Sequence, residues 1–206
     1  MTRKSKMQTS EKTIEDIFKP KDFVITSASI KDGLCNYSFE IISGVGAGDT
    51  HNVKGSGIVD DDMATAFATF NTHLAYIDDV FKHSGTDVED IDKMHSHDLS
   101  FLYQVSGFKI KGGKDNESII LMGSKSISSS GGRIELSSPR IPLDNLSSYK
   151  WYNELKVAAD KARTEVELYK EGKYTAVEHD EPEEDHRNQS KFDFSNPEGK
   201  DEDEES

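Results

Sequence analysis

The feature that most constrains the fold is a series of secondary-structure signals that occurs twice in the same order. Three short alternating segments and one long amphipathic segment occupy residues 21–86, and the same order returns over residues 99–173. Shifting the chain by 80 positions aligns residues 23–44 with 103–124 and gives five identities. Self-similarity at a fixed spacing indicates a repeated structural unit. We therefore predict an α+β fold in which two tandem strand-strand-strand-helix repeats form one domain.

The predicted strands combine β-branched or aromatic residues with turn residues at their ends. In chain order they cover residues 23–30, 36–42, about 50–58, 101–111, 117–123 and 133–138. Side chains alternate between the two faces of a strand. Alternation over residues 36–42 therefore predicts Tyr37, Phe39 and Ile41 on one face of the sheet, with Ser38 and Glu40 on the other.

The two predicted helices cover residues 60–82 and about 144–171. The acids Asp60 to Asp62 are typical of a helix N-terminus, and we expect Asp144 or Asn145 to cap the second helix. Apolar residues recur every three or four positions, which is typical of a helix with one buried face. In the first helix they are Met63, Phe67, Phe70, Leu74, Ile77 and Phe81. In the second they are Trp151, Leu155, Ala158, Ala162, Val166 and Tyr169, and Gly172 marks the end.

Three segments lie outside the predicted repeats. We expect residues 1–20 to be a flexible N-terminal segment and residues 87–98 to be an acidic linker between the repeats. Residues 174–206 carry 13 acids and three bases and have few apolar residues. Such a composition cannot bury enough apolar surface to offset the entropy of ordering, so we expect a disordered acidic tail.

Charge is also uneven within the predicted fold. Residues 21–100 hold 14 acids and five bases, whereas residues 101–173 hold nine acids and 12 bases. The second half can therefore carry a basic surface although the whole chain has a net charge of −14. Bases and aromatic residues on one sheet can bind single-stranded nucleic acid through phosphate contacts and base stacking. The candidate residues are Lys109, Lys111, Lys114, Lys125, Arg133 and Arg140 for phosphate, and Tyr103 for stacking.

Regular alternation over residues 101–111 would place Tyr103, Val105, Lys109 and Lys111 on one face, provided that Gly107 introduces no bulge. The alternative interpretation is a solvated face that carries lysines without binding anything. In the tail, Phe192 and Phe194 lie among acids and are candidate anchors for a replication or recombination protein.

Other patterns indicate little chemistry. His95 and His97, with Asp90, Asp92 and Asp98, could chelate a metal, but a solvated linker is the favoured interpretation. The glycines of residues 44–49 lack the Lys-Ser/Thr of a P-loop, which favours a connecting loop. His73 and Cys35 are expected to be buried side chains. We therefore expect no enzymatic activity, no metal and no cofactor.

No run of apolar residues reaches the ~18 that a membrane span needs, and we expect a cytoplasmic protein without a membrane partner. A homo-oligomer is left open.

The order of elements over residues 23–171 resembles that of the Whirly and PUR families, which bind single-stranded nucleic acid. The stretches NTHLAYI (71–77), VSGFKIKG (105–112) and SSPRI (137–141) are also similar to small acidic proteins of phages and prophages. These resemblances imply a phage-type accessory protein of DNA replication or recombination that binds single-stranded DNA. The alternative is an acidic protein–protein interaction module, such as a DNA mimic or an inhibitor of a host protein.

Overall fold

The computed structural model describes residues 22–113, 116–127 and 129–174. The elements in these ranges follow one another in the order β1 (Phe23–Lys31), β2 (Leu34–Ile41), β3 (Thr50–Ile58), α2 (Asp61–Ile77), α3 (Val80–Ser84), the 3-10 helix η1 (Asp92–Ser96), α4 (Asp98–Phe101), β4 (Tyr103–Lys111), β5 (Ser118–Ser126), β6 (Arg133–Ser137), β7 (Ile141–Pro142) and α5 (Tyr152–Lys170).

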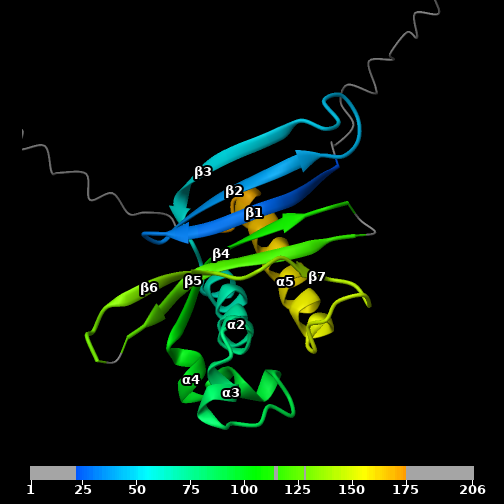
Figure 1. Cartoon of the computed structure of the whole chain (residues 1–206). Coiled ribbons are helices and arrows are strands. Elements are labelled where there is room, and N and C mark those ends of the chain that lie inside the picture. The colour runs from blue at the N-terminus through cyan, green and yellow to red at the C-terminus, as the bar shows by residue number, and fades with distance from the viewer. Residues whose placement is uncertain (1–21, 114–115, 128, 175–206) are drawn as a thin grey trace, which may run out of the picture.

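The strands form a single antiparallel sheet in the order β3-β2-β1-β4-β5-β6, with β7 paired to the start of β5 (Figure 1). The predicted α+β class is therefore confirmed, although β7 was not expected. The central strands β1 and β4 are joined by only three residue pairs, in which Ala28 lies opposite Phe108. This short seam connects a half of the sheet made from β1–β3 to a half made mainly from β4–β6.

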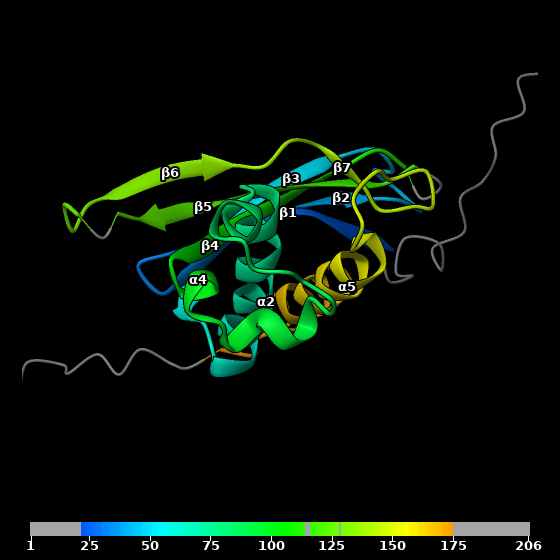
Figure 2. The same cartoon turned by 60° about the horizontal axis from the view of Figure 1, so that its bottom comes forward.

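The helices lie on one side of the sheet, as Figure 2 shows. Phe67 and Phe70 of α2 pack on Phe108 of β4, with ring centroids 5.6 and 5.9 Å apart. Helix α5 contacts α2 and β1, and its Tyr169 meets Tyr37 of β2 edge-on at 6.2 Å. Each long helix therefore contacts strands of the opposite half of the sheet, and both halves share one core.

The first predicted helix divides into two. Asp60 caps α2, because its carboxylate accepts a hydrogen bond from the backbone N–H of Met63 at 2.9 Å. Asp79 has a φ of 56°, a left-handed conformation that cannot continue an α-helix. Helix α2 consequently ends at Ile77, and α3 starts in a new direction that still buries Phe81.

The second predicted helix starts later than expected. The Asp144 side chain accepts a hydrogen bond from the N–H of Leu146, and Ser147 accepts one from the N–H of Tyr149. Local bonds of this kind compete with helix formation. Helix α5 begins at Tyr152, so the predicted caps at Asp144 and Asn145 were wrong.

Residues 87–98, expected to be a linker, are part of the folded helical layer. Val88 and Ile91 are buried, with 4% and 0% exposure. The Lys150 ammonium also donates to the Val88 carbonyl oxygen at 3.1 Å. Acidic side chains thus cover the outside of a segment whose Val88 and Ile91 belong to the core.

Candidate functional site

The face of the sheet opposite the helices carries small polar side chains in rows across the strands. Strand register aligns Asn52 of β3, Ser38 of β2, Ser27 of β1 and Lys109 of β4 in one such row. A neighbouring row consists of Lys54, Asn36, Ser29 and Gly107. We call this surface the open face, because the helices pack against the other side of the sheet.

A shallow groove lies on the open face. Its lining residues include Thr26, Ser27, Ser38, Glu40, Asn52, Lys109 and Lys111. The hydroxyl of Ser38 donates to the Asn52 amide oxygen at 2.6 Å, which fixes one side of the groove. Hydroxyl, amide and ammonium groups together offer many hydrogen-bond donors to an anionic ligand.

Charge divides between the two sides of the molecule. The strands carry six bases and two acids. Residues 59–102, which connect β3 to β4 on the helical side, carry ten acids and two bases. Of the basic residues in the strands, Lys31, Lys54, Lys109, Lys111 and Arg133 fall on the open face by alternation. The net negative chain thus has one surface with an excess of positive charge.

Four of the predicted phosphate-binding residues lie on this surface. Lys109 and Lys111 are exposed and line the groove. Arg133 is exposed and its Nη1 donates to the Gln104 side-chain oxygen. Arg140 is exposed and its Nε donates to the Ser118 hydroxyl.

Tyr103 does not share a face with these bases, contrary to the predicted alternation. The register between β4 and β5 shifts between Val105 and Gly107, which is a β-bulge. A bulge adds one residue and so reverses the alternation beyond it. Tyr103 therefore faces the helices, where it is only 2% exposed, while Lys109 and Lys111 face outward. The predicted role of Tyr103 in base stacking is wrong.

Lys125 is also not available on the open face, because it is paired on the helical side. Its ammonium lies 2.7 Å from a carboxylate oxygen of Asp78, which accepts the Tyr103 hydroxyl at 2.5 Å. Burial opposes ionisation of Asp78, but the bonds from Lys125 and Tyr103 outweigh it and lower the pKa of Asp78. Burial, together with the Asp78 carboxylate, raises the pKa of Tyr103 to about 12. The three groups form a network on the helical side, so Lys125 does not lie with Lys109 and Lys111 on the open face.

Three other predicted site residues cannot be placed. Lys114 lies outside the described residues, in the connection between β4 and β5. Phe192 and Phe194 of the tail also lie outside them. Their predicted roles stay predictions.

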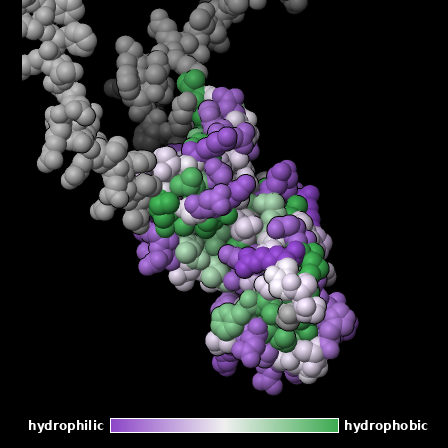
Figure 3. All heavy atoms as spheres, turned by 90° about the vertical axis from the view of Figure 1, so that its left-hand side faces the viewer, coloured by the Kyte–Doolittle hydropathy of each residue, from purple (hydrophilic) through white to green (hydrophobic). Residues whose placement is uncertain are grey.

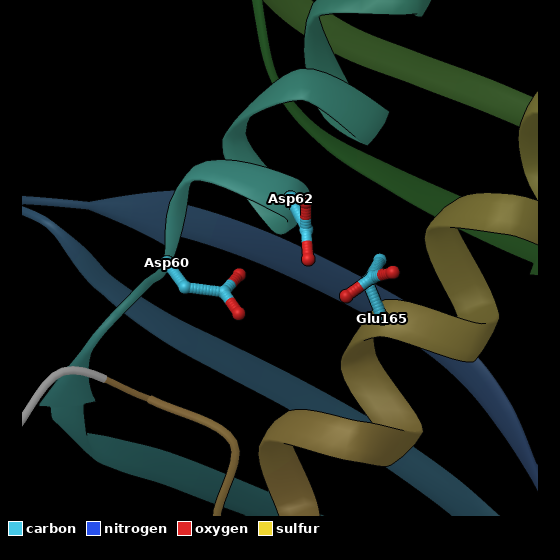
Figure 4. A group of neighbouring side chains, drawn as sticks. All are labelled: Asp60, Asp62 and Glu165. Atoms are coloured by element: carbon cyan, nitrogen blue, oxygen red, sulfur yellow. The ribbon is translucent and has the colours of Figure 1, made fainter.

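One cluster of carboxylates has metal-like spacing. Figure 4 shows Asp60 and Asp62 at the start of α2 and Glu165 of α5 pointing toward one another, and their oxygens lie within 4.8 Å. The Lys173 ammonium bonds all three, at 3.3, 2.8 and 2.8 Å. Its hydrogen bonds to Asp62 and then Glu165 raise the pKa of Lys173. A protein cation thus already lies among the three carboxylates, offsets part of their charge and ties the end of α5 to the start of α2.

The predicted alternative of a metal site around residues 90–98 finds no support in the described part of the chain, where only the preceding cluster has suitable spacing. The Nδ1 atom of His95 is hydrogen-bonded to the Thr72 hydroxyl at 2.8 Å. The Nδ1 atom of His97 accepts the N–H of Leu99 at 3.1 Å. Both histidines therefore hold the fold together locally.

Lys31 and Lys54 are the basic residues that sequence reasoning did not include. Lys54 of β3 lies opposite Asn36 of β2, and Lys31 of β1 lies opposite Leu34 of β2. Of these three strands, only β2 had residues whose faces were assigned from the sequence. Ser38 was assigned to the face opposite Tyr37. Following that face from β2 to the adjacent strand β3 would have identified Lys54. That step requires the strand register, which the sequence alone does not supply.

Comparison of this chain with protein families, with curated proteins and with solved structures finds no match. Within the described residues, no helix combines the length and the apolar character needed to cross a membrane. The geometry and charge of the open face are the features of this chain that bear on its function.

Proposed function

We propose that this protein binds single-stranded nucleic acid across the open face of its sheet. It would act without catalysis, as a phage-type accessory protein of DNA replication or recombination in the cytoplasm. The observation that carries the proposal is the row of small polar residues that ends at Lys109, with Lys111 beside it in the same groove.

Lysines bind nucleic acid by neutralising phosphates and releasing counterions. The small hydroxyl and amide side chains of the row would donate hydrogen bonds to phosphate and sugar oxygens. A flexible single strand can adapt to the twisted face of a sheet, whereas a stiff duplex must be deformed to do so. With Tyr103 buried, we expect electrostatic binding with little sequence preference.

The test is fluorescence anisotropy with a labelled oligothymidine of about 30 nucleotides, long enough for several sites. The double variant Lys109→Ala/Lys111→Ala should bind at least about tenfold more weakly. The matched control is Lys156→Ala/Lys161→Ala, which removes two exposed lysines from α5 on the helical side.

The salt dependence gives a second readout. Each lost phosphate contact on a single strand lowers the slope of log K against log salt by about 0.7, so the double variant should lose about 1.4. The proposal is refuted if the slope is unchanged, or if the control weakens binding as much as the variant does.

We propose that the acidic tail competes with nucleic acid for the open face. Residues 174–206 carry 13 acids against three bases, and the last described residue, Tyr174, lies beside Gly57 of β3. A protein ending at Tyr174 should then bind the oligonucleotide more tightly than the full chain. Phe192 and Phe194 would anchor a replication or recombination protein on the same tail.

We also propose that the sheet arose by duplication of one strand-strand-strand-helix unit. The pair Ala28–Phe108 is spaced by the same 80 residues as the sequence repeat, and the register irregularities at 25/27 and 105/107 keep that spacing. Thr26 and Ser106 within these bulges each donate to a carbonyl oxygen of the neighbouring strand. Shared defects at equivalent positions support a common origin.

A second candidate function is supported by the acids on the helical side. Ten acids and two bases in residues 59–102 would suit a basic protein partner, as in a module that mimics DNA. Failure of both the full chain and the version ending at Tyr174 to bind a single strand at low salt would favour this function.

A further inference from the structure

The strand β6 forms an edge of the sheet that nothing covers in the described part of the chain. It pairs with β5 alone, and four of its five residues are exposed. Its hairpin with β5 extends beyond the helices in Figure 2. An edge strand presents a row of unpaired backbone N–H and C=O groups that can pair with another strand.

The opposite edge, β3, is different. Lys54 occupies its middle, and a second copy of this strand could offer it no acid. The Gly57 carbonyl oxygen accepts the Tyr169 hydroxyl at 2.5 Å. A lysine in an edge strand is a common protection against pairing, so we regard β3 as a closed edge.

The charges of β6 are complementary to those of the same strand run in the opposite direction. Arg133 and Glu135 stand on the same face, separated by Ile134, whose side chain is 49% exposed. Antiparallel pairing about a two-fold axis at Ile134 would place Arg133 opposite the partner's Glu135, and Glu135 opposite the partner's Arg133. Opposite charges directly across two strands stabilise their pairing.

We propose that two copies of this protein associate through β6, in antiparallel register centred on Ile134. Residues that lie opposite each other in two paired strands point to the same face of the sheet. The two-fold axis of a symmetric antiparallel pair must therefore pass through one residue and its copy, not between two residues. Centring on Arg133 would oppose the two arginines, and centring on Glu135 would oppose the two glutamates. The register at Ile134 is the one that pairs both charges.

Recognition at β6 would depend on backbone pairing and charge. Figure 3 views the molecule from the left-hand side of Figure 1, where hydrophobic residues lie between hydrophilic ones. Arg133 can keep its bond to Gln104 in the dimer, because a guanidinium has five N–H donors. The two open faces would lie on the same side of one continuous sheet.

The experiment is sedimentation velocity of the full chain over a wide range of concentration, without nucleic acid. The unchanged protein should show a monomer–dimer equilibrium. The variants Arg133→Glu and Glu135→Arg should each dimerise at least about tenfold more weakly, because each puts like charges opposite one another. Lys156→Glu on α5 is the control for a changed net charge and should dimerise as the unchanged protein does.

Two further samples test the register itself. The exchange variant Arg133→Glu/Glu135→Arg should recover dimerisation, because it restores both pairs with reversed signs. An equimolar mixture of Arg133→Glu and Glu135→Arg should associate more tightly than either variant alone, because the heterodimer pairs both charges. Circular dichroism of each variant checks that it is folded.

The proposal is overturned if the unchanged protein is monomeric at every concentration. It is also overturned if the single variants dimerise normally, or if neither the exchange variant nor the mixture recovers association. Because no nucleic acid is present, these outcomes are independent of those for the proposed function.

Discussion

Replacing His73 with asparagine should remove much of the acid sensitivity of this protein. His73 is 1% exposed, and its Nδ1 is hydrogen-bonded to the Tyr149 hydroxyl at 2.8 Å. Burial, and then the nearby His95, lower the pKa of His73 to about 3. Asparagine can keep a polar atom near the Nδ1 position but does not titrate.

Proton linkage gives the direction and the size of the change in stability with pH. The pKa of His73 falls from about 6.5 in the unfolded chain to about 3 in the folded one, so only the unfolded state takes up a proton in between. Stability is therefore fully present above about pH 6.5 and decreases below it, by about 1.4 kcal/mol per pH unit. Between pH 6.5 and pH 5 the loss attributable to His73 is about 2 kcal/mol.

Urea unfolding at pH 7.5 and at pH 5 measures this effect. The single tryptophan, Trp151, is buried with 8% exposure and provides a fluorescence signal for the transition. The variant should be less stable at pH 7.5, but its free energy of unfolding should fall by about 2 kcal/mol less on acidification. Every other ionisable group is present in both proteins, so its contribution cancels in the comparison.

A constant difference in stability between the two proteins at both pH values would refute the reasoning. It would mean that His73 can be protonated in the folded state and therefore has access to water or to a compensating group.

Three other substitutions test specific contacts. Tyr103→Phe should lower stability by about 1 kcal/mol, through loss of the bond to Asp78, and leave oligonucleotide affinity unchanged; thermal melts and anisotropy together check this. Lys173→Met should lower the melting temperature by leaving three carboxylates to repel one another, and added salt should reduce the difference. Gly55→Ala should cost about 2 kcal/mol or more in urea melts, because the new methyl group would overlap the backbone carbonyl oxygen of Cys35.

Periodicity predicted the elements better than it predicted their ends. The apolar stripe of α2 was read correctly because helical spacing over several turns leaves few alternatives. The end of α2 depended on the left-handed conformation of Asp79, which several residue types can adopt in a turn. The start of α5 depended on bonds made by Asp144 and Ser147, which compete with the helix over only one turn.

Only part of the candidate site could be predicted from the sequence, because the rest depends on which strands are neighbours and in what register. Lys109 and Lys111 were identified from the sequence, but the partners of these lysines on the open face come from other strands and need the register. The bulge between Val105 and Gly107 reverses the side-chain alternation along β4. Tyr103 therefore lies in the core and not on the expected surface. A single inserted position has this effect because the side-chain period of a strand is two.

The packing of α2 on β4 also bears on how the chain is made. During synthesis α2 is complete at Ile77, yet Phe108, on which Phe67 and Phe70 pack, is 31 residues further along. At about 5 to 20 residues per second, roughly 1.5 to 6 s separate the completion of α2 from the synthesis of Phe108. Throughout this interval the aromatic face of α2 has no partner of its own. A ribosome that stalls before β4 would therefore release a fragment prone to aggregation and suited to capture by a chaperone.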